Sequence, residues 1–347
     1  MIIKQAREAA RQWVIEEGSS IPGFCGAYTA GSTNWLPDDA ALATTADFDV
    51  MVVVEDPSSA GNRTKLVYRD VLLEVSYLGN DQLRSRDLVL GDYHLAPSLR
   101  TANILLDPSG HLTGLLAAVS SNYAKRQWVR KRCAHARNRV LDYLRSVNEE
   151  VPLRDQVIAW LFAAGITTHA LLVAGLRNPT VRTRYAAVRE LLVDYGHLEF
   201  HEALSELLGC ARIGRERVEQ HLGMLTGLFD TAKEAIKTQF PFASEISDIA
   251  RPIAINGSLN LIERGYHREA MFWIAVTDSR CHKVLYHDAP AETKQRFSHS
   301  YRELVGDLRV SSFAEIRRRC EDVERILPRV WELAEAIMEA NQGIKDE

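Results

Sequence analysis

The chain has 347 residues and a formal net charge of −4, with 46% hydrophobic and 25% charged residues. These proportions are those of a globular soluble protein with room for two domains. Because neutralisation of phosphates supplies much of the affinity for nucleic acids, the near-neutral charge disfavours a nucleic-acid partner and favours a small-molecule substrate.

Neither a membrane span nor a disulfide framework is expected. The sequence has no run of eighteen uninterrupted apolar residues, and residues 1–8 have the pattern of an amphipathic helix start rather than the apolar core of a signal peptide. The five cysteines are odd in number and form no C-x-x-C motif, which indicates reduced, mostly buried thiols and no zinc site. We therefore expect a cytoplasmic protein.

The first 110 residues are predicted to form a small α+β domain with a mixed sheet. An amphipathic helix comes first, because Ile3, Ala10 and Trp13 recur on one helical face. Two of the strands are expected to form a hairpin that turns at Arg69-Asp70. In chain order, the predicted elements are a helix over 3–17, strands over 24–30, 47–54, 65–68 and 71–77, a helix over 80–90, a loop over 91–97, a strand over 102–106 and a turn over 107–110.

From His111 onward, strand patterns nearly vanish and helical patterns recur between Gly or Pro residues. No repeat of constant period is visible. The second domain, residues 111–347, is therefore predicted to be a larger all-helical bundle. Its predicted helices span 111–147, 153–175, 179–194, 198–209, 214–238, 244–264, 266–279, 290–305 and 313–342.

Two carboxylates one residue apart, Asp47 and Asp49, begin an apolar strand. Residues i and i+2 of a strand point to the same face, so these acids are expected to project together. Aligned carboxylates repel each other and shift each other's pKa unless a cation lies between them. The pattern predicts a Mg²⁺ site, because Mg²⁺ commonly bridges carboxylates and substrate phosphates.

Two further features accompany the acid pair. Gly31-Ser32 ends the preceding strand, and its glycine lets the backbone approach a phosphate closely. Glu74 lies within an apolar strand, where an unpaired carboxylate costs several kcal/mol. We therefore expect Glu74 to face a cation or a basic partner; the alternative is the solvent face of an edge strand.

The order of strand, Gly31-Ser32, Asp47-Phe48-Asp49 and then Glu74 resembles the nucleotidyltransferase fold of the DNA polymerase beta superfamily. The similarity is greatest to its antibiotic-modifying branch, the kanamycin and lincosamide enzymes, and covers residues 1–110. It implies that Gly31 and Ser32 bind the triphosphate of an NTP, with ATP preferred. It also implies that the catalytic acids Asp47, Asp49 and Glu74 hold two Mg²⁺ ions.

The chain departs from the family pattern in two ways. Fourteen residues separate Ser32 from Asp47, and residues 35–39 in this interval are expected to form an extra loop over the site. The segment after Ser32 also lacks the basic residue that many relatives place there.

A cationic stretch offers a replacement for that missing charge. Residues 125–139 hold seven Lys or Arg and no acid. Arg126 and Arg130 are expected to bind the nucleotide, because cations stabilise charge on phosphoryl oxygens. The alternative is a solvated helix face.

Other polar clusters carry weaker signals. Residues 177–185 open a predicted helix near Pro179, which suits capping better than anion binding. His197 and His201 lie four residues apart, but the acid between them is misplaced for the H-E-x-x-H zinc motif. His282, His287 and Asp288 gather around Cys281 in a predicted loop. The base that deprotonates the acceptor is left open among Glu190, Glu199 and Glu202.

The expected activity is Mg²⁺-dependent transfer of a nucleoside monophosphate from ATP to a hydroxyl of a small molecule, such as an antibiotic, with release of pyrophosphate. Two alternatives stay open: a nucleotidyltransferase that modifies a protein or an RNA, and a non-catalytic nucleotide-binding module. The expected partners are an NTP and a small-molecule acceptor, with no membrane and no nucleic acid. A homodimer also stays open.

Overall fold

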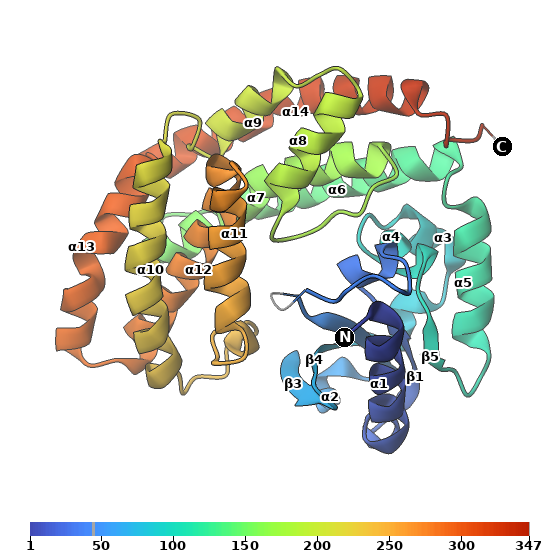
Figure 1. Cartoon of the computed structure of the whole chain (residues 1–347). Coiled ribbons are helices and arrows are strands. Elements are labelled where there is room, and N and C mark those ends of the chain that lie inside the picture. The colour runs from blue at the N-terminus through green and yellow to red at the C-terminus, as the bar shows by residue number, and fades with distance from the viewer. Residues whose placement is uncertain (44–45, 347) are drawn as a thin grey trace. The chain divides into compact units, whose positions relative to one another are not determined.

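A computed structural model describes residues 1–43 and 46–346 (Figure 1). A five-stranded sheet forms in the N-terminal part and a larger all-helical part follows, which confirms the predicted α+β class. The chain divides into two compact units. The first comprises Met1–Arg132, Leu176–Asn178 and the C-terminal residues from Gly343, and the second comprises Cys133–Gly175 and Pro179–Gln342. Residues 111–132, assigned to the helical domain from the sequence, thus belong to the first unit.

The sheet of the first unit is mixed. Its order is β3-β4-β2-β1-β5, in which β2 and β4 run parallel and all other neighbours run antiparallel. The hairpin of β3 and β4 turns at Arg69 and Asp70 as predicted, and both residues have positive φ, which matches the twist of the flanking strands. The strands are β1 (Phe24–Thr29), β2 (Phe48–Val54), β3 (Thr64–Tyr68), β4 (Val71–Gly79) and β5 (Ile104–Leu106).

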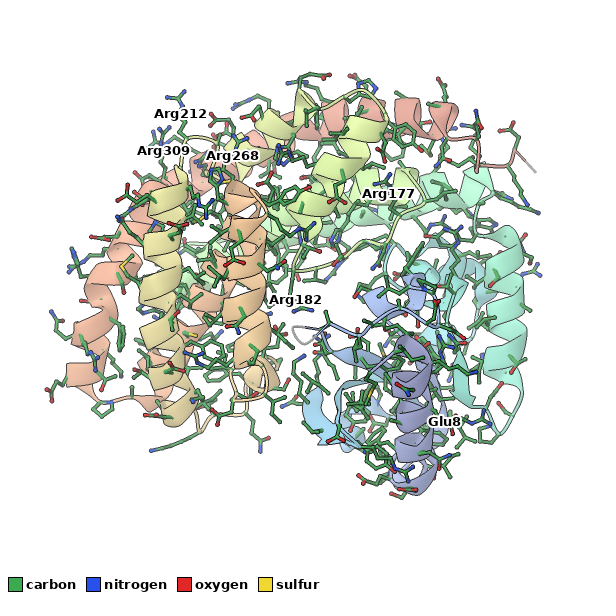
Figure 2. All side chains as sticks on the ribbon, in the orientation of Figure 1. Glu8, Arg177, Arg182, Arg212, Arg268 and Arg309 are labelled. Carbon is green, nitrogen blue, oxygen red and sulfur yellow. The ribbon has the colours of Figure 1, made fainter. Side chains whose placement is uncertain are left out.

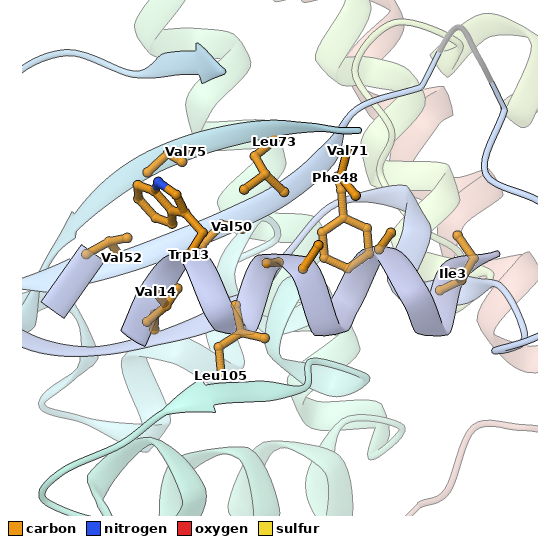
Figure 3. Close-up of a cluster of buried hydrophobic side chains, with 14 of the residues drawn as sticks. Ile3, Trp13, Val14, Phe48, Val50, Val52, Val71, Leu73, Val75 and Leu105 are labelled. Carbon is orange, nitrogen blue, oxygen red and sulfur yellow. The ribbon is translucent and has the colours of Figure 1, made fainter. Parts of the chain in front are cut away.

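Helices cover both faces of this sheet. The apolar side of α1 (Ile3–Glu16) packs through Trp13 on one face, against alternate residues of β2 and β4 such as Val50 and Leu73 (Figure 3). The opposite face, which carries Val53, is covered by shorter helices. These are α3 (Arg86–Gly91), α4 (Leu95–Arg100) and α5 (His111–Asn122). The loop predicted over 91–97 is therefore wrong at its end, because α4 begins at Leu95.

The helix predicted over 111–147 is interrupted. It consists of α5 and α6 (Arg126–Ser146), separated by Tyr123, Ala124 and Lys125. The C-terminal segment causes the break, because the N–H of Arg126 donates to the carbonyl of Lys345 at 2.8 Å rather than to the preceding turn. No local pattern at residues 123–125 could have predicted this long-range contact.

The described residues of the second unit form helices joined by loops, with no strand among them. Its helices α7 and α12 supply much of the core, since most residues of both are buried. The shorter α2 (Pro57–Ala60) belongs to the first unit. The helices of the second unit, apart from α6, are α7 (Leu153–Ala174), α8 (Arg184–Asp194), α9 (Phe200–Leu207), α10 (Arg215–Ala235), α11 (Gly257–Glu263), α12 (His267–Asp288), α13 (Ala291–Asp307) and α14 (Phe313–Ala340).

Within the described residues, α7 alone is long and apolar enough to cross a membrane by length and composition. However, 83% of its most apolar window is buried inside the protein. Burial on all sides is the pattern of a core helix, whose surroundings are other helices of the same chain.

Candidate active site

The register of three strands brings the predicted acids together. Asp49 of β2 is the direct partner of Glu74 of β4, and Glu74 is in turn the partner of Lys65 of β3. Directly paired residues point to the same face of a sheet, so Lys65, Glu74 and Asp49 form one row across the sheet. Asp47 lies two residues before Asp49 and joins this row from the same side. We call these four residues the acid row.

Lys65 is the central cation of the acid row. Its Nζ contacts Asp47 Oδ2 and lies 3.1 Å from Glu74 Oε2. Arg63 adds a second cation, with Nη1 3.1 Å from Glu74 Oε1. The prediction that Glu74 faces a basic partner is confirmed, and the alternative of an edge-strand solvent face is wrong, because β4 has a neighbour on each side.

The acid row holds more negative than positive charge. Burial, followed by the charges of Asp47 and Glu74, raises the pKa of Asp49 well above its usual range, and Lys65 offsets this only in part. Burial also raises the pKa of Glu74, against the lowering effect of Arg63. Burial works to lower the pKa of Lys65, but Asp47 and Glu74 outweigh it and the net shift is upward. The ammonium group is therefore held charged between its two acids.

Gly31 lies directly against Asp49. Its φ is +72°, and a Cβ at this position would come within 1.8 Å of Asp49 Oδ2. Only glycine fits both the backbone conformation and the space. Ala30 N also donates to Asp49 O at 2.9 Å, which ties the end of β1 to β2. The Gly31-Ser32 segment thus lies beside the acid row, with Ser32 at the start of the short 3-10 helix η2 (Ser32–Trp35).

The segment after η2 does not form the predicted loop over the site. Asp38 and Ala40 accept hydrogen bonds from the backbone of Lys4 and Ile3, and Asp38 forms an ion pair with Arg7. These residues run along the first turns of α1, which covers the face of the sheet opposite the acid row. The loop prediction failed because the partner of the segment lies more than thirty residues earlier in the chain.

Arg100 is a cation that the sequence did not identify. Its guanidinium lies over the Trp35 ring, 5.2 Å from the centroid, and over the Tyr123 ring at 4.5 Å. Its Nη1 donates to the Leu176 carbonyl at 3.1 Å. Because Trp35 ends the helix that Ser32 begins, Arg100 stands next to the segment that lacks a basic residue of its own.

The predicted cations of α6 have mixed surroundings. Arg126 Nε lies 2.6 Å from Asp346 Oδ1, so a carboxylate of the same unit already neutralises it. Arg130 is exposed. The fully buried Arg132 donates to the carbonyls of Leu90 and Tyr123 and lies over the Tyr123 ring, so it holds the fold together. Nucleotide binding by Arg126 and Arg130 stays a prediction.

The acid row has the donor type that suits Mg²⁺ but not the arrangement. Carboxylate oxygens are the ligands that Mg²⁺ prefers. Burial first, and then the charges of Asp47 and Glu74, raise the pKa of Asp49. Asp49 forms no ion pair within the described ranges. However, no group of three or more His, Cys, Asp or Glu in residues 1–43 and 46–346 is arranged to hold a metal ion. The carboxylate donors suit Mg²⁺ by their chemistry, but Lys65 lies between Asp47 and Glu74. Sharing of an ion by all three acids would require Lys65 to leave.

The other predicted clusters serve the helical unit. Cys281, His282, His287 and Asp288 lie on α12 rather than in a loop, because no helix breaker occurs before Pro290. Pro179 lies ahead of α8, which begins only at Arg184, so it does not open that helix. Burial lowers the pKa of His201 to about 4, which leaves a neutral imidazole 3.5 Å from Glu269.

The three acids considered as the base differ in their partners. Glu202 forms a bidentate ion pair with Arg268, at 2.8 and 2.9 Å. Glu190 accepts from the Tyr266 hydroxyl at 3.2 Å. Glu199 lies 3.7 Å from the His197 ring. None is distinguished as a base by these contacts, and the choice stays open.

No protein-family model matches the chain, and no curated protein matches it either.

Proposed function

We propose that the first unit is a nucleotidyltransferase, which moves a nucleoside monophosphate from an NTP to a hydroxyl of a small molecule and releases pyrophosphate. The observation that carries this proposal is the acid row with Gly31 against Asp49. A buried excess of carboxylates is costly unless a cation joins it. Beside it lies a glycine segment whose backbone can approach an anion closely.

The residues of the site divide into two groups by charge. Asp47, Asp49 and Glu74 would hold Mg²⁺, which when bound lowers the pKa of an acceptor hydroxyl and offsets negative charge on the leaving pyrophosphate. Gly31 and Ser32 supply backbone and hydroxyl donors for the phosphates. Arg100, which lies over the Trp35 ring, would add positive charge beside this segment, together with the predicted contacts Arg126 and Arg130.

ATP is the first NTP to test, and aminoglycosides and lincosamides are the first acceptors. Both acceptor classes carry several hydroxyl groups. The five cysteines form no disulfide, which supports the cytoplasm, where ATP and Mg²⁺ are abundant, as the location.

The test is a transfer assay with ATP labelled at the α-phosphate. Wild-type protein should move the label to a small-molecule acceptor in the presence of Mg²⁺, and Asp49→Asn should abolish the transfer. The matched control is Asp87→Asn, which removes an exposed acid of the same unit. Equal activity of Asp49→Asn and wild type would overturn the assignment. Label found on RNA or protein instead would redirect the proposal to a macromolecular acceptor.

A further inference from the structure

The helical unit contains a cavity that is rich in arginine. It has a volume of about 230 Å³ and lies where the loop after α9 meets the loop after α13. A water molecule occupies about 30 Å³ of liquid, so the cavity has room for a tetrahedral anion with its waters. Its charged lining residues are Arg212, Arg217, Arg309 and Arg319 together with only two acids, Glu206 and Asp307. Figure 2 shows Arg212 and Arg309 near each other at one end of this unit.

Arg309 occupies a backbone position that favours glycine. Helices α8, α9, α11 and α13 all end in the same motif, in which the second residue after the helix takes a left-handed conformation and two backbone hydrogen bonds close the turn. Three of these positions hold glycine: Gly196, Gly209 and Gly265. The fourth holds Arg309, with φ of 57°. Because a side chain is strained in this conformation, the arginine is a costly choice at this position.

Two of the four arginines are used by the fold. Arg319 donates to the carbonyls of Glu206 and Leu308, at 2.9 and 3.0 Å, and so joins the ends of α9 and α13. Arg217 pairs with Asp307 at 2.6 Å and with Glu303 at 3.2 Å. Arg319 thus keeps an uncompensated positive charge at the cavity wall, whereas two carboxylates offset the charge of Arg217.

The positive charges of Arg309 and Arg212 are weakly compensated. Arg309 has no hydrogen bond or ion pair within the described residues. Arg212 is 82% exposed and approaches Glu206 only to 3.8 Å. Burial lowers the pKa of Arg319, and the nearby charge of Arg309 adds to this lowering. Like charges thus crowd one cavity, and an anion would relieve their repulsion.

We propose that this cavity is a binding site for a phosphate group, either inorganic phosphate or the phosphate of a small phosphorylated molecule. Arginine suits this ligand because its planar fork of donors matches two phosphate oxygens at once. Arg309 and Arg212 bind the anion from two loops, while Arg319 adds positive charge at the wall and Arg217 holds Asp307 away from the anion. The site does not depend on the acid row of the first unit.

Isothermal titration of the full chain with inorganic phosphate, pyrophosphate and glycerol phosphate tests this site. EDTA and constant ionic strength keep Mg²⁺-dependent binding at the first unit out of the measurement. Arg309→Gly should weaken binding by about tenfold or more, the effect of losing a charge-assisted contact, while its relaxed backbone raises the thermal unfolding midpoint. Arg212→Ala should weaken binding without changing the midpoint. Arg302→Ala, an exposed arginine of α13 outside the cavity, is the matched control.

Each outcome decides the proposal. Weaker binding by both cavity variants and not by Arg302→Ala supports it, and preference for glycerol phosphate over inorganic phosphate assigns the site to a phosphorylated molecule. Wild-type protein that binds none of the three anions at millimolar concentration overturns it. Equal binding by Arg309→Gly and wild type also overturns it, as does binding of a short RNA without binding of the small anions.

Discussion

Replacing Lys65 by Met removes the central cation of the acid row and keeps most of the side-chain volume. The Lys65 side chain is 4% exposed, and those of Asp47 and Glu74 are 8% and 9% exposed. Removal of one partner from a buried ion pair costs about 3–5 kcal/mol, because a buried charge is left without compensation. Since Arg63 still neutralises part of Glu74, we expect the free energy of unfolding to fall by about 3 kcal/mol at neutral pH.

Urea unfolding in EDTA and in Mg²⁺ measures this effect. A ligand that binds only the folded state at about 100 times its Kd adds about 2.7 kcal/mol of stability. With Lys65 gone, all three carboxylates are free to share a cation, so Mg²⁺ should stabilise Lys65→Met more than wild type. Lys4→Met, which removes an exposed lysine of the same unit, is the control.

Two results would refute this reasoning. Equal stability of Lys65→Met and wild type in EDTA would show that the ion pairs contribute little. A destabilised variant that Mg²⁺ fails to rescue would show that the three acids do not share a cation. The deficit should also shrink at low pH, because protonated acids no longer need the ammonium group.

Three further variants follow from the same contacts. Gly31→Ala should lower stability by about 1–3 kcal/mol and abolish nucleotide transfer, because its Cβ would collide with Asp49; unfolding and transfer assays check both. The pKa of Asp49 is raised in the folded state, so ionisation of this acid makes the folded protein less stable as pH rises above 3.8, the ordinary pKa of the group. Asp49→Asn should therefore unfold at a higher urea concentration than wild type at pH 7 in EDTA, while transfer is lost. In α12, burial raises the pKa of Asp278 to about 8 and lowers that of His282 to about 4. Between about pH 4 and 6.5, Asp278 makes the free energy of unfolding fall with rising pH and His282 makes it rise, so the two effects cancel. From about pH 6.5 to 8 only Asp278 contributes, and the free energy of unfolding falls by about 1.4 kcal/mol per pH unit. Asp278→Asn should abolish that slope in unfolding measured across the pH range.

Most of the sheet could be predicted from the sequence because the patterns that specify it are local. The alternation of β2 and β4, the turn at Arg69-Asp70 and the apolar stripe of α1 each depend on neighbours within a few residues. The helix break before Arg126 and the path of Asp38 along α1 depend on partners that are far away in the sequence. Local patterns carry no information on such partners, and both predictions were wrong for that reason.

The helical unit shows a different limit. The predicted helix over 266–279 left Cys281 to Asp288 in a loop, yet this stretch completes α12 with Cys281, Val284 and Leu285 buried. Burial raises the pKa of Asp278 and lowers that of His282, so it disfavours the charged form of both. Composition alone does not distinguish a buried polar helix from a loop, since both admit the same residues.

The sequence also contains the information that places Lys65 in the acid row. The turn at Arg69-Asp70 pairs Tyr68 with Val71, and counting back along both strands pairs Lys65 with Glu74. Lys65 could therefore be predicted as a neighbour of Glu74 from the position of the turn alone. The three carboxylates alone form an unexplained excess of negative charge, whereas Lys65 pairs with Asp47 and Glu74 and offsets part of it. Binding of Mg²⁺ by all three acids, as proposed above, would first require Lys65 to leave Asp47 and Glu74. A variant without this lysine should therefore bind Mg²⁺ more readily while folding less stably.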